Sequence, residues 1–501
     1  MSNVLPVRAR DFEFIYGRLE ILWYLVLTES LSDDQSLRLA GVNAIRRLLS
    51  VAEDPPVTEV LEANVVPKFI EIMNDYSFPK IQFEACWAIT NIGSSEHTPV
   101  LAEHGAIPVL VRLLKDSADT NVRDQSIWCL GNIAGDGPSL RNQLLETPSA
   151  VEHLMLNIKH PGSKDLLRNA TWTLSNLCRG KPAPNMHFAQ QFIPALAHLV
   201  TLEDTEVLTD ALWALSYLTN SENEIIELVV NSNIAGKVIG LLGHSCYEIV
   251  IPALRTAGNI VAGTDTQADA AVNAGIIPKL VQLMKHDRKN AIREAVWTAS
   301  NIAAGTKDQI SALVSFPGAL DMVIHHLAHS PWEIKKEAAW TVANIVNSGS
   351  GHDVDVLVAA NALEPLIALV HSSDVRITLV VLEAFESILQ QGRKNMEAGR
   401  SSDFTDVFEE AGGLDALETL QDHESEQVYQ KVVDIMSEYF EAEEAEDQNF
   451  TPGVEQTNSG DKVFSFGAKQ TATPTQPNNT VFGQSVGSPV SNTGFNFAAF
   501  T

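Results

Sequence analysis

The chain has 501 residues, of which 45% are hydrophobic and 19% are charged, which is enough apolar material for a large core but too long a chain for one compact domain. Its 34 Lys and Arg face 63 Asp and Glu, so the formal net charge is -29, which repels phosphate backbones and favours basic partners. We therefore do not expect nucleic acid as a ligand. The four cysteines show no CxxC spacing, which indicates a reduced intracellular chain with buried thiols and no metal or cofactor.

The first 31 residues form an atypical N-terminal segment. Its most apolar stretch, residues 21–27, is too short to span a bilayer. The segment also lacks the basic start, long apolar run and small-residue cleavage site of a signal peptide. We therefore expect neither a membrane partner nor the secretory pathway.

Tryptophan marks an internal repeat from residue 87 onward. Six of the eight tryptophans recur at one point of an apolar helical segment, with separations of 41, 44, 41, 84 and 43 residues: Trp87, Trp128, Trp172, Trp213, Trp297 and Trp340. The interval of 84 is two periods, and Arg255 stands at its midpoint. A period of about 42 with helical patterning is typical of armadillo and HEAT repeats rather than of the shorter tetratricopeptide and ankyrin repeats.

Proline and glycine separate the expected helices within each period. Pro108, Pro194 and Pro278 are predicted to open helices, where a missing N–H costs nothing. Glycine follows the Trp-bearing helix in "NIAGDG", "NIVAG" and "NIAAG", and we expect it to adopt the left-handed cap conformation. Each helix has an apolar stripe that only neighbouring repeats can bury.

The pattern predicts an all-α fold, a right-handed superhelical solenoid of about ten armadillo repeats over residues 32–440. Residues 441–501 form a separate tail, which begins with an acidic run and continues in Asn, Thr, Ser, Gly, Gln and Pro. Such a composition cannot build a core, and we expect disorder there.

Two further positions keep a fixed distance from each tryptophan. Four residues later come Asn91, Asn132, Asn176, Tyr217, Asn301 and Asn344, with Asn259 four after Arg255. Three residues earlier come Glu84, Gln125, Asn169, Asp210, Glu294 and Glu337. Residues three and four apart share a helix face, so stacked repeats should present a ladder of acid or amide, indole and amide.

The chemistry of this ladder suits an extended peptide rich in Lys and Arg. Asparagine amides can hold a peptide main chain, indoles can take the aliphatic stems with cation–π attraction, and carboxylates can receive the charged heads. A single tryptophan on a helix is more often a core residue. Six in one frame, each with a polar residue at i+4, favour a binding surface, because a buried amide needs a partner every time.

The repeats resemble those of the importin-α family of nuclear import adaptors. The resemblance is carried by "QFEACWAITNIGSS", "WCLGNIAGDG", "LRNATWTLSNLCRGK", "DALWALSYLTN", "ALRTAGNIVAGTDTQ", "REAVWTASNIAAG" and "KEAAWTVANIV", and by "EYFEAEEAEDQNF" near the end. It implies a protein that binds Lys/Arg-rich nuclear-localisation signals of cargo proteins and shuttles between cytoplasm and nucleus.

The resemblance also implies two peptide grooves and a region between them. Its major groove corresponds to Trp87, Asn91, Trp128, Asn132, Asp136, Trp172 and Asn176. Its minor groove corresponds to Glu294, Trp297, Asn301, Glu337, Trp340 and Asn344. The linker of a bipartite signal would cross Asp210, Trp213, Tyr217, Arg255 and Asn259.

The termini suggest further partners. The family begins with a long basic segment that binds importin-β, whereas residues 1–31 hold three Arg against four acids, so we expect that segment to be absent or replaced and importin-β not to be engaged. The acidic run resembles the family region that contacts an export receptor. The FG dipeptides of "VFSFGAKQ" and "TVFGQS" suggest contact with nucleoporins.

Two other classes of function are alternatives to a nuclear import adaptor. An armadillo scaffold for signalling or adhesion is the alternative, but a groove for acidic partners should be basic. An enzyme has little support, because the sequence contains no phosphate-binding glycine loop with its lysine, no HExxH, and no nucleophile placed beside a histidine and an acid.

Overall fold

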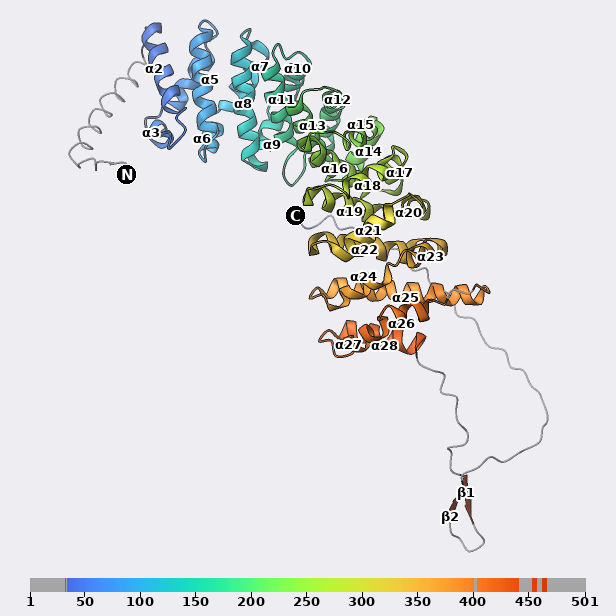
Figure 1. The fold of residues 1–501 in the computed structure, drawn as a ribbon. Coiled ribbons are helices and arrows are strands. Elements are labelled where there is room, and N and C mark those ends of the chain that lie inside the picture. Colours follow the sequence, from blue (N-terminus) through green and yellow to red (C-terminus); the bar gives the residue numbers. More distant parts are fainter. Residues whose placement is uncertain (1–31, 33, 401–402, 441–452, 457–461, 466–501) are drawn as a thin grey trace, which may run out of the picture. The chain divides into compact units, whose positions relative to one another are not determined.

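A computed structural model describes residues 32, 34–400, 403–440, 453–456 and 462–465 (Figure 1). The chain divides into two compact units, residues 1–341 and 342–501, and each is described by itself. The atypical segment 1–31, the acidic run and the FG dipeptides lie outside the described residues.

The described part of the first unit consists of helices that follow one another in chain order (Figure 1). The helices are α2 (Gln35–Leu48), α3 (Val57–Glu62), α4 (Val66–Met73), α5 (Pro79–Gly93), α6 (Thr98–Glu103), α7 (Ala106–Asp116), α8 (Thr120–Asp136), α9 (Pro138–Glu146), α10 (Ala150–Lys159), α11 (Lys164–Cys178), α12 (Met186–Leu199), α13 (Thr205–Thr219), α14 (Asn223–Asn231), α15 (Ile234–Leu241), α16 (Tyr247–Val261), α17 (Asp265–Asn273), α18 (Ile276–Leu283), α19 (Lys289–Ala303), α20 (Lys307–Val314), α21 (Ala319–His329) and α22 (Trp332–Ser348).

The boundary between the units falls inside α22, and the second unit continues with more helices and a hairpin. Its elements are α23 (Gly351–Ala359), α24 (Leu363–Ile367), the 3-10 helix η1 (Ala368–His371), α25 (Val375–Glu397), α26 (Phe404–Glu410), α27 (Gly413–Leu420), α28 (Glu426–Tyr439), β1 (Gly453–Gln456) and β2 (Lys462–Ser465). The two strands pair antiparallel, with Gly453 opposite Ser465, a hairpin that the sequence analysis did not predict. The helical prediction is confirmed from Gln35 to Tyr439.

From α2 to α19, the longest helix of each repeat packs against its counterparts in the neighbouring repeats. Thus α5 lies between α2 and α8, and α11 lies between α8 and α13. Small buried side chains such as Ala85, Ala88 and Ala211 allow these helices to approach closely. Larger ones such as Ile89 and Ile133 are fully buried, and each contributes about 1.5–3 kcal/mol relative to an exposed side chain.

Glycine plays a different role from the one expected at the end of the Trp-bearing helices. Gly263 and Gly305 do not adopt a positive φ; instead, a Cβ added to either would lie within about 2 Å of the Oε1 of the glutamine four residues later. Eight of the described residues with positive φ stand one or two residues before the second helix of a repeat: Asn64, Gly105, Ser149, Asn233, Gly275, Gly318, Asn361 and Gly412.

The prediction for proline is also corrected. Pro108 and Pro278 occupy the third positions of α7 and α18, near the helix starts as expected. Pro194, however, lies inside α12, because this repeat has one continuous helix where its neighbours have two short ones.

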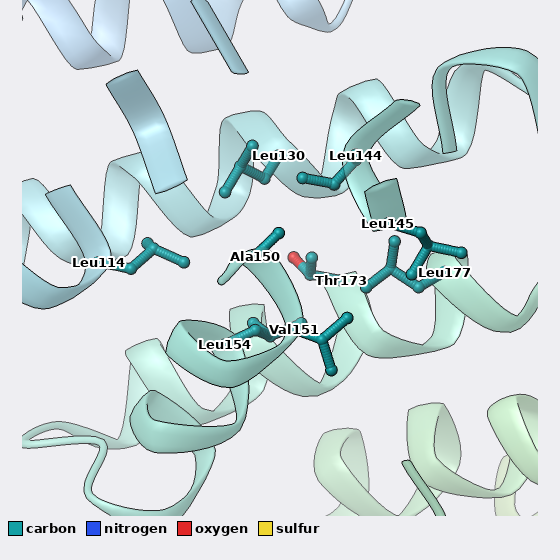
Figure 2. A pocket seen from close by; sticks show the side chains of 9 residues that line it. All are labelled: Leu114, Leu130, Leu144, Leu145, Ala150, Val151, Leu154, Thr173 and Leu177. Carbon is teal, nitrogen blue, oxygen red and sulfur yellow. The ribbon is translucent and has the colours of Figure 1, made fainter. Parts of the chain in front are cut away.

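The interior between α8, α9, α10 and α11 is apolar and closely packed. A cavity of about 10 Å³ remains there, and Figure 2 shows leucines and a valine around it. Thr173 is the polar residue in the lining of this cavity, and its hydroxyl donates to the carbonyl of Ile127 at 3.0 Å. A space of this size and chemistry is a packing void rather than a ligand site.

Helix length was compared with that of a membrane span. None of the described helices is by itself long and apolar enough to cross a bilayer; two pairs, 307–329 and 351–371, meet the criteria only jointly and are bent by 81° and 91°.

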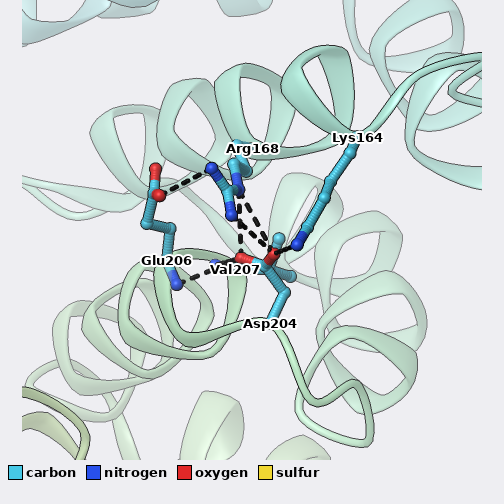
Figure 3. A network of polar contacts seen from close by, with 5 residues as sticks. All are labelled: Lys164, Arg168, Asp204, Glu206 and Val207. Carbon is cyan, nitrogen blue, oxygen red and sulfur yellow. Dashed lines mark hydrogen bonds and ion pairs between the residues drawn. The ribbon is translucent and has the colours of Figure 1, made fainter.

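A polar network joins α11 to the start of α13 (Figure 3). The Asp204 carboxylate accepts from Lys164 Nζ at 2.9 Å and from Arg168 Nη2 at 2.9 Å, and it caps α13 by accepting from the backbone N–H of Glu206 and Val207. The hydrogen bond from Arg168 holds the pKa of Asp204 well below its usual range. The ionised carboxylate therefore stabilises the contact between two repeats.

This network predicts a local pH dependence. Because the folded-state pKa of Asp204 lies below the unfolded value of about 3.9, its stabilisation is present above that pH and is lost as the pH falls through the folded pKa. Asp204→Asn keeps a capping side chain but removes the charge. We expect amide hydrogen exchange in the first turn of α13 to become about twofold to fivefold faster at pH 7, with a smaller difference at pH 3.

The matched control is Glu203→Gln, which removes a neighbouring exposed acid outside the network. Exchange in α13 that responds equally to both substitutions at pH 7 would contradict the assigned role of Asp204.

Candidate peptide-binding groove

The six tryptophans of the predicted ladder lie on equivalent helices. They stand on α5, α8, α11, α13, α19 and α22, and α16 carries Arg255 at the same register. Trp128 is the most open, with 42% of its surface exposed, and the other five are half-buried. These indoles are thus partly accessible rather than sealed in the core.

The asparagines bind the backbone of the preceding repeat. The Nδ2 groups of Asn132, Asn176 and Asn259 donate to the carbonyls of Thr90, Gly131 and Ser216 at 3.0–3.2 Å. Each acceptor belongs to the residue just before the asparagine register of the previous repeat. An amide has a second N–H and an oxygen, so this bond fixes Asn132 and Asn176 and leaves them further hydrogen-bonding capacity. The Nδ2 of Asn259 also donates to Thr219 Oγ1 at 3.2 Å, which leaves its oxygen.

The remaining residues at the i+4 register are less uniform. Asn91 Nδ2 donates to Ser50 Oγ at 2.8 Å, whereas Asn301 Nδ2 is buried and has no hydrogen-bond partner in the described chain. Tyr217 stacks on Trp213 with ring centroids 5.9 Å apart, and burial raises the pKa of its hydroxyl. Asn344 follows Trp340 on α22, in the second unit.

Two glycines missed by the sequence analysis allow the indoles to approach the backbone. A Cβ added to Gly131 would lie 2.3 Å from Trp172, and one added to Gly258 would lie 2.4 Å from Trp297. Any larger residue would displace the ring. In the sequence, the sign of their role is that each glycine directly precedes the asparagine of its repeat.

Asp136 is the last residue of α8 and is exposed. The preceding Gly135 lies against the next repeat, since a Cβ added there would be 3.2 Å from Asn176 Nδ2. Asp136 therefore stands at the end of its helix, one residue from this contact with Asn176.

The acids three residues before the tryptophans are of two kinds. Glu84 and Glu294 already pair with arginines of the chain: Glu84 Oε2 lies 2.7 Å from Arg46 Nε, and Glu294 Oε1 lies 2.6 Å from Arg255 Nη2 and 3.0 Å from Arg293 Nη2. The carboxylates of Glu84 and Glu294 are thus already paired with cations of the chain itself.

Asp210 and Glu337 are of the second kind, in which burial disfavours the ionised form of the carboxyl group. Desolvation by burial raises the pKa of Asp210 to about 6, helped by the charge of Glu206, and burial likewise raises the pKa of Glu337. A carboxylate in such a position gains from a nearby cation, because the cation offsets the cost of its desolvation.

Four buried side-chain polar atoms lack a hydrogen-bond partner among the described residues: Gln125 Oε1, Thr209 Oγ1, Glu294 Oε2 and Asn301 Nδ2. Three of these four belong to ladder registers, either three residues before a tryptophan or four after it. Buried polar atoms without partners are rare in native proteins.

The comparisons with known proteins agree with this architecture. Residues 53–94, 94–135 and 264–304 match the armadillo/beta-catenin-like repeat, and residues 402–453 match the atypical Arm repeat. An engineered protein of known crystal structure aligns with a TM-score of 0.73 over 83% of this chain and 98% of its own, at 23% identity, which bears on the fold alone. The predicted armadillo fold is thereby confirmed.

Sequence relatives are more specific. Importin subunit alpha-1b of Oryza sativa subsp. japonica is 38% identical over 447 residues, which cover 88% of this chain and 82% of that protein. Importin subunit alpha-4 of Arabidopsis thaliana is 41% identical over 441 residues, covering 87% and 81%.

These relatives match this chain over most of both lengths, and they are non-enzymatic transport adaptors, which confirms the prediction that the chain is not an enzyme. The chain belongs to the importin-α family of nuclear transport adaptors.

Proposed function

We propose that this chain carries cargo proteins into the nucleus by binding their Lys/Arg-rich localisation signals in extended form along the ladder. The observation that carries the proposal is the row of partly exposed indoles at one register of successive repeats, with the partly buried carboxylates of Asp210 and Glu337 at the register three residues earlier. The side chains of a Lys/Arg-rich peptide would stack on these indoles and would offset the desolvation of these carboxylates.

The spacing of the repeats fits an extended ligand. Packed helices are about 8–10 Å apart, and an extended peptide rises about 3.3 Å per residue, so each repeat meets two or three ligand residues. The asparagines, each fixed by a bond to the preceding repeat, would offer their remaining N–H and oxygen to the ligand main chain. The indole faces would take lysine and arginine stems.

The major groove is proposed on α5, α8 and α11, and includes Asp136 as an exposed acid for a ligand lysine. The minor groove is proposed around Trp297 and Trp340. Asp210, Trp213 and Tyr217 would meet the linker of a bipartite signal. The protein would then shuttle between cytoplasm and nucleus, with an export receptor and nucleoporins as further partners.

An armadillo scaffold for an acidic or phosphorylated partner is the competing function. The net charge of -29 and the raised pKa of Asp210 and Glu337 weigh against it, because an acidic partner would bring further negative charge to carboxylates that already lack solvation. The same carboxylates favour a cationic partner.

The first test is a titration of the full chain with a fluorescent basic localisation peptide. The variant Trp128→Ala/Asp136→Lys removes the most exposed indole and reverses an exposed charge, while keeping the hydrogen bonds between repeats. We expect it to bind at least tenfold more weakly, because a cation–π contact of about 0.5–2 kcal/mol and an ion pair are both lost.

The matched control is Trp332→Ala, which removes another exposed tryptophan outside the ladder register. Circular dichroism checks that the variants fold. A wild-type chain that fails to bind the peptide, or equal affinities for the ladder variant and the control, would refute the proposed groove.

The raised pKa of Asp210 predicts a pH dependence of binding. A bound cation returns the pKa toward its ordinary value of about 3.9, so protons compete with the ligand. For a peptide long enough to reach Trp213, we expect affinity to fall about fourfold between pH 7.5 and pH 5.5. In Asp210→Asn the affinity should be lower at pH 7.5 and nearly constant over this range. A peptide without histidine makes the measurement specific to the protein, and an unchanged pH profile in Asp210→Asn would exclude this carboxylate.

A further inference from the structure

The first repeat has an arginine where the following repeats have tryptophan. Arg46 stands 41 residues before Trp87, and Ser50 stands 41 residues before Asn91, so both occupy ladder registers of the first repeat, Arg46 on α2 and Ser50 two residues after its end. The hydrogen bond from Asn91 Nδ2 to Ser50 Oγ supports this alignment, because asparagines of later repeats also bind the repeat before them.

Arg46 covers the first indole. Its guanidinium carbon lies 4.3 Å from the centre of a Trp87 ring, and its Nε lies 2.7 Å from Glu84 Oε2. The side chains of Arg46 and Glu84 are only 13% and 14% exposed. The contact thus combines an indole face, a cation and a carboxylate, the set that a ligand lysine would use in the proposed groove.

The same arrangement recurs at the start of the second row of indoles. Arg255, on the helix before Trp297, places its guanidinium carbon 5.6 Å from that ring and pairs with Glu294. Arg293 adds a second cation to the same carboxylate oxygen. Two rows of indoles therefore begin with an internal arginine, and the two arginines stand five repeat periods apart in the sequence.

We propose that Arg46 is a cap that occupies the first cation slot of its row and so limits how far a bound basic peptide extends toward α2. This inference rests on the proposed function. A ligand side chain would have to displace a guanidinium that is already tethered and paired, whereas the internal arginine loses no translational freedom. The usable slots of this row then begin between Trp87 and Trp128.

The surroundings of Glu84 have room for another side chain. A surface hollow of roughly 390 Å³ between α2 and α5 is lined by Glu84 together with Asn43, Lys80 and Phe83. Removing the Arg46 guanidinium would leave an indole face and a carboxylate beside this hollow. An additional ligand lysine could then bind where the cap had been.

A purely structural role for Arg46 makes a different prediction. If the arginine served only to join α2 to α5, its removal would reduce stability but would not change how many ligand residues the groove accepts. The length of peptide that contributes to affinity therefore separates the two roles.

The experiment compares a core basic peptide with versions extended by one to three lysines at either end, using the full chain and Arg46→Ala. We expect the wild type to gain little from the extension that points toward α2. Relative to its own affinity for the core peptide, Arg46→Ala should gain about three- to thirty-fold from an extension at one end, as expected for a new cation–π contact. Glu84→Gln in the same background should reduce that gain.

Arg46→Lys is the conservative variant and the safeguard if Arg46→Ala does not fold. Lysine keeps the charge but not the planar stack on the indole, so we expect a smaller gain from the extended peptide. Equal extended-to-core affinity ratios in the wild type and in the folded variant would overturn the cap. Failure of the wild type to bind any of the peptides would instead overturn the proposed function, and the cap with it.

Discussion

Each repeat can bury the apolar side of its longest helix only against the corresponding helices of its neighbours, and this constraint positions the ladder. Small residues such as Ala85 and Ala88 bring the helices close enough for Asn132 to reach the Thr90 carbonyl. The same bond recurs at Asn176 and Asn259, so it follows from repeat register rather than from one local site. The packing that stabilises the chain therefore also orients the residues proposed to bind peptide.

The tryptophan period was sufficient to predict the helical repeats and the shared register of the indoles, because both depend on spacing alone. Backbone conformation was predicted less well. The left-handed position lies between the first two helices of a repeat, where Asn64, Ser149 and Gly105 all serve, so no single residue type marks it in the sequence. The position of Pro194 within its helix was predicted wrongly for a related reason. The sequence around Pro194 does not indicate that one continuous helix, α12, replaces the two short helices of the neighbouring repeats.

Spacing predicted the positions of the ladder residues in the sequence, but it did not predict the ion pairs that the ladder acids form. Spacing identified Glu84 and Glu294 as ladder acids, but their partners Arg46 and Arg255 come from the preceding repeat, 38 and 39 residues away in sequence. Arg46 was not predicted as a ladder residue, because the repeats were recognised by the spacing of their tryptophans and the first repeat has none. Gly131 and Gly258 were likewise missed, because their importance lies in a close approach to an indole of the next repeat.

Net charge therefore says little about which carboxylates could receive a ligand. The value of -29 counts all acids alike, whereas the ladder contains acids that the chain has already neutralised and acids that it has buried. Asp210 and Glu337 lie in places where desolvation disfavours their ionised forms, and there a cation interacts more strongly than it would in bulk water. Selectivity for a basic peptide would then arise from these few carboxylates, spaced by the repeat, while the remaining acids contribute a general attraction that salt screens.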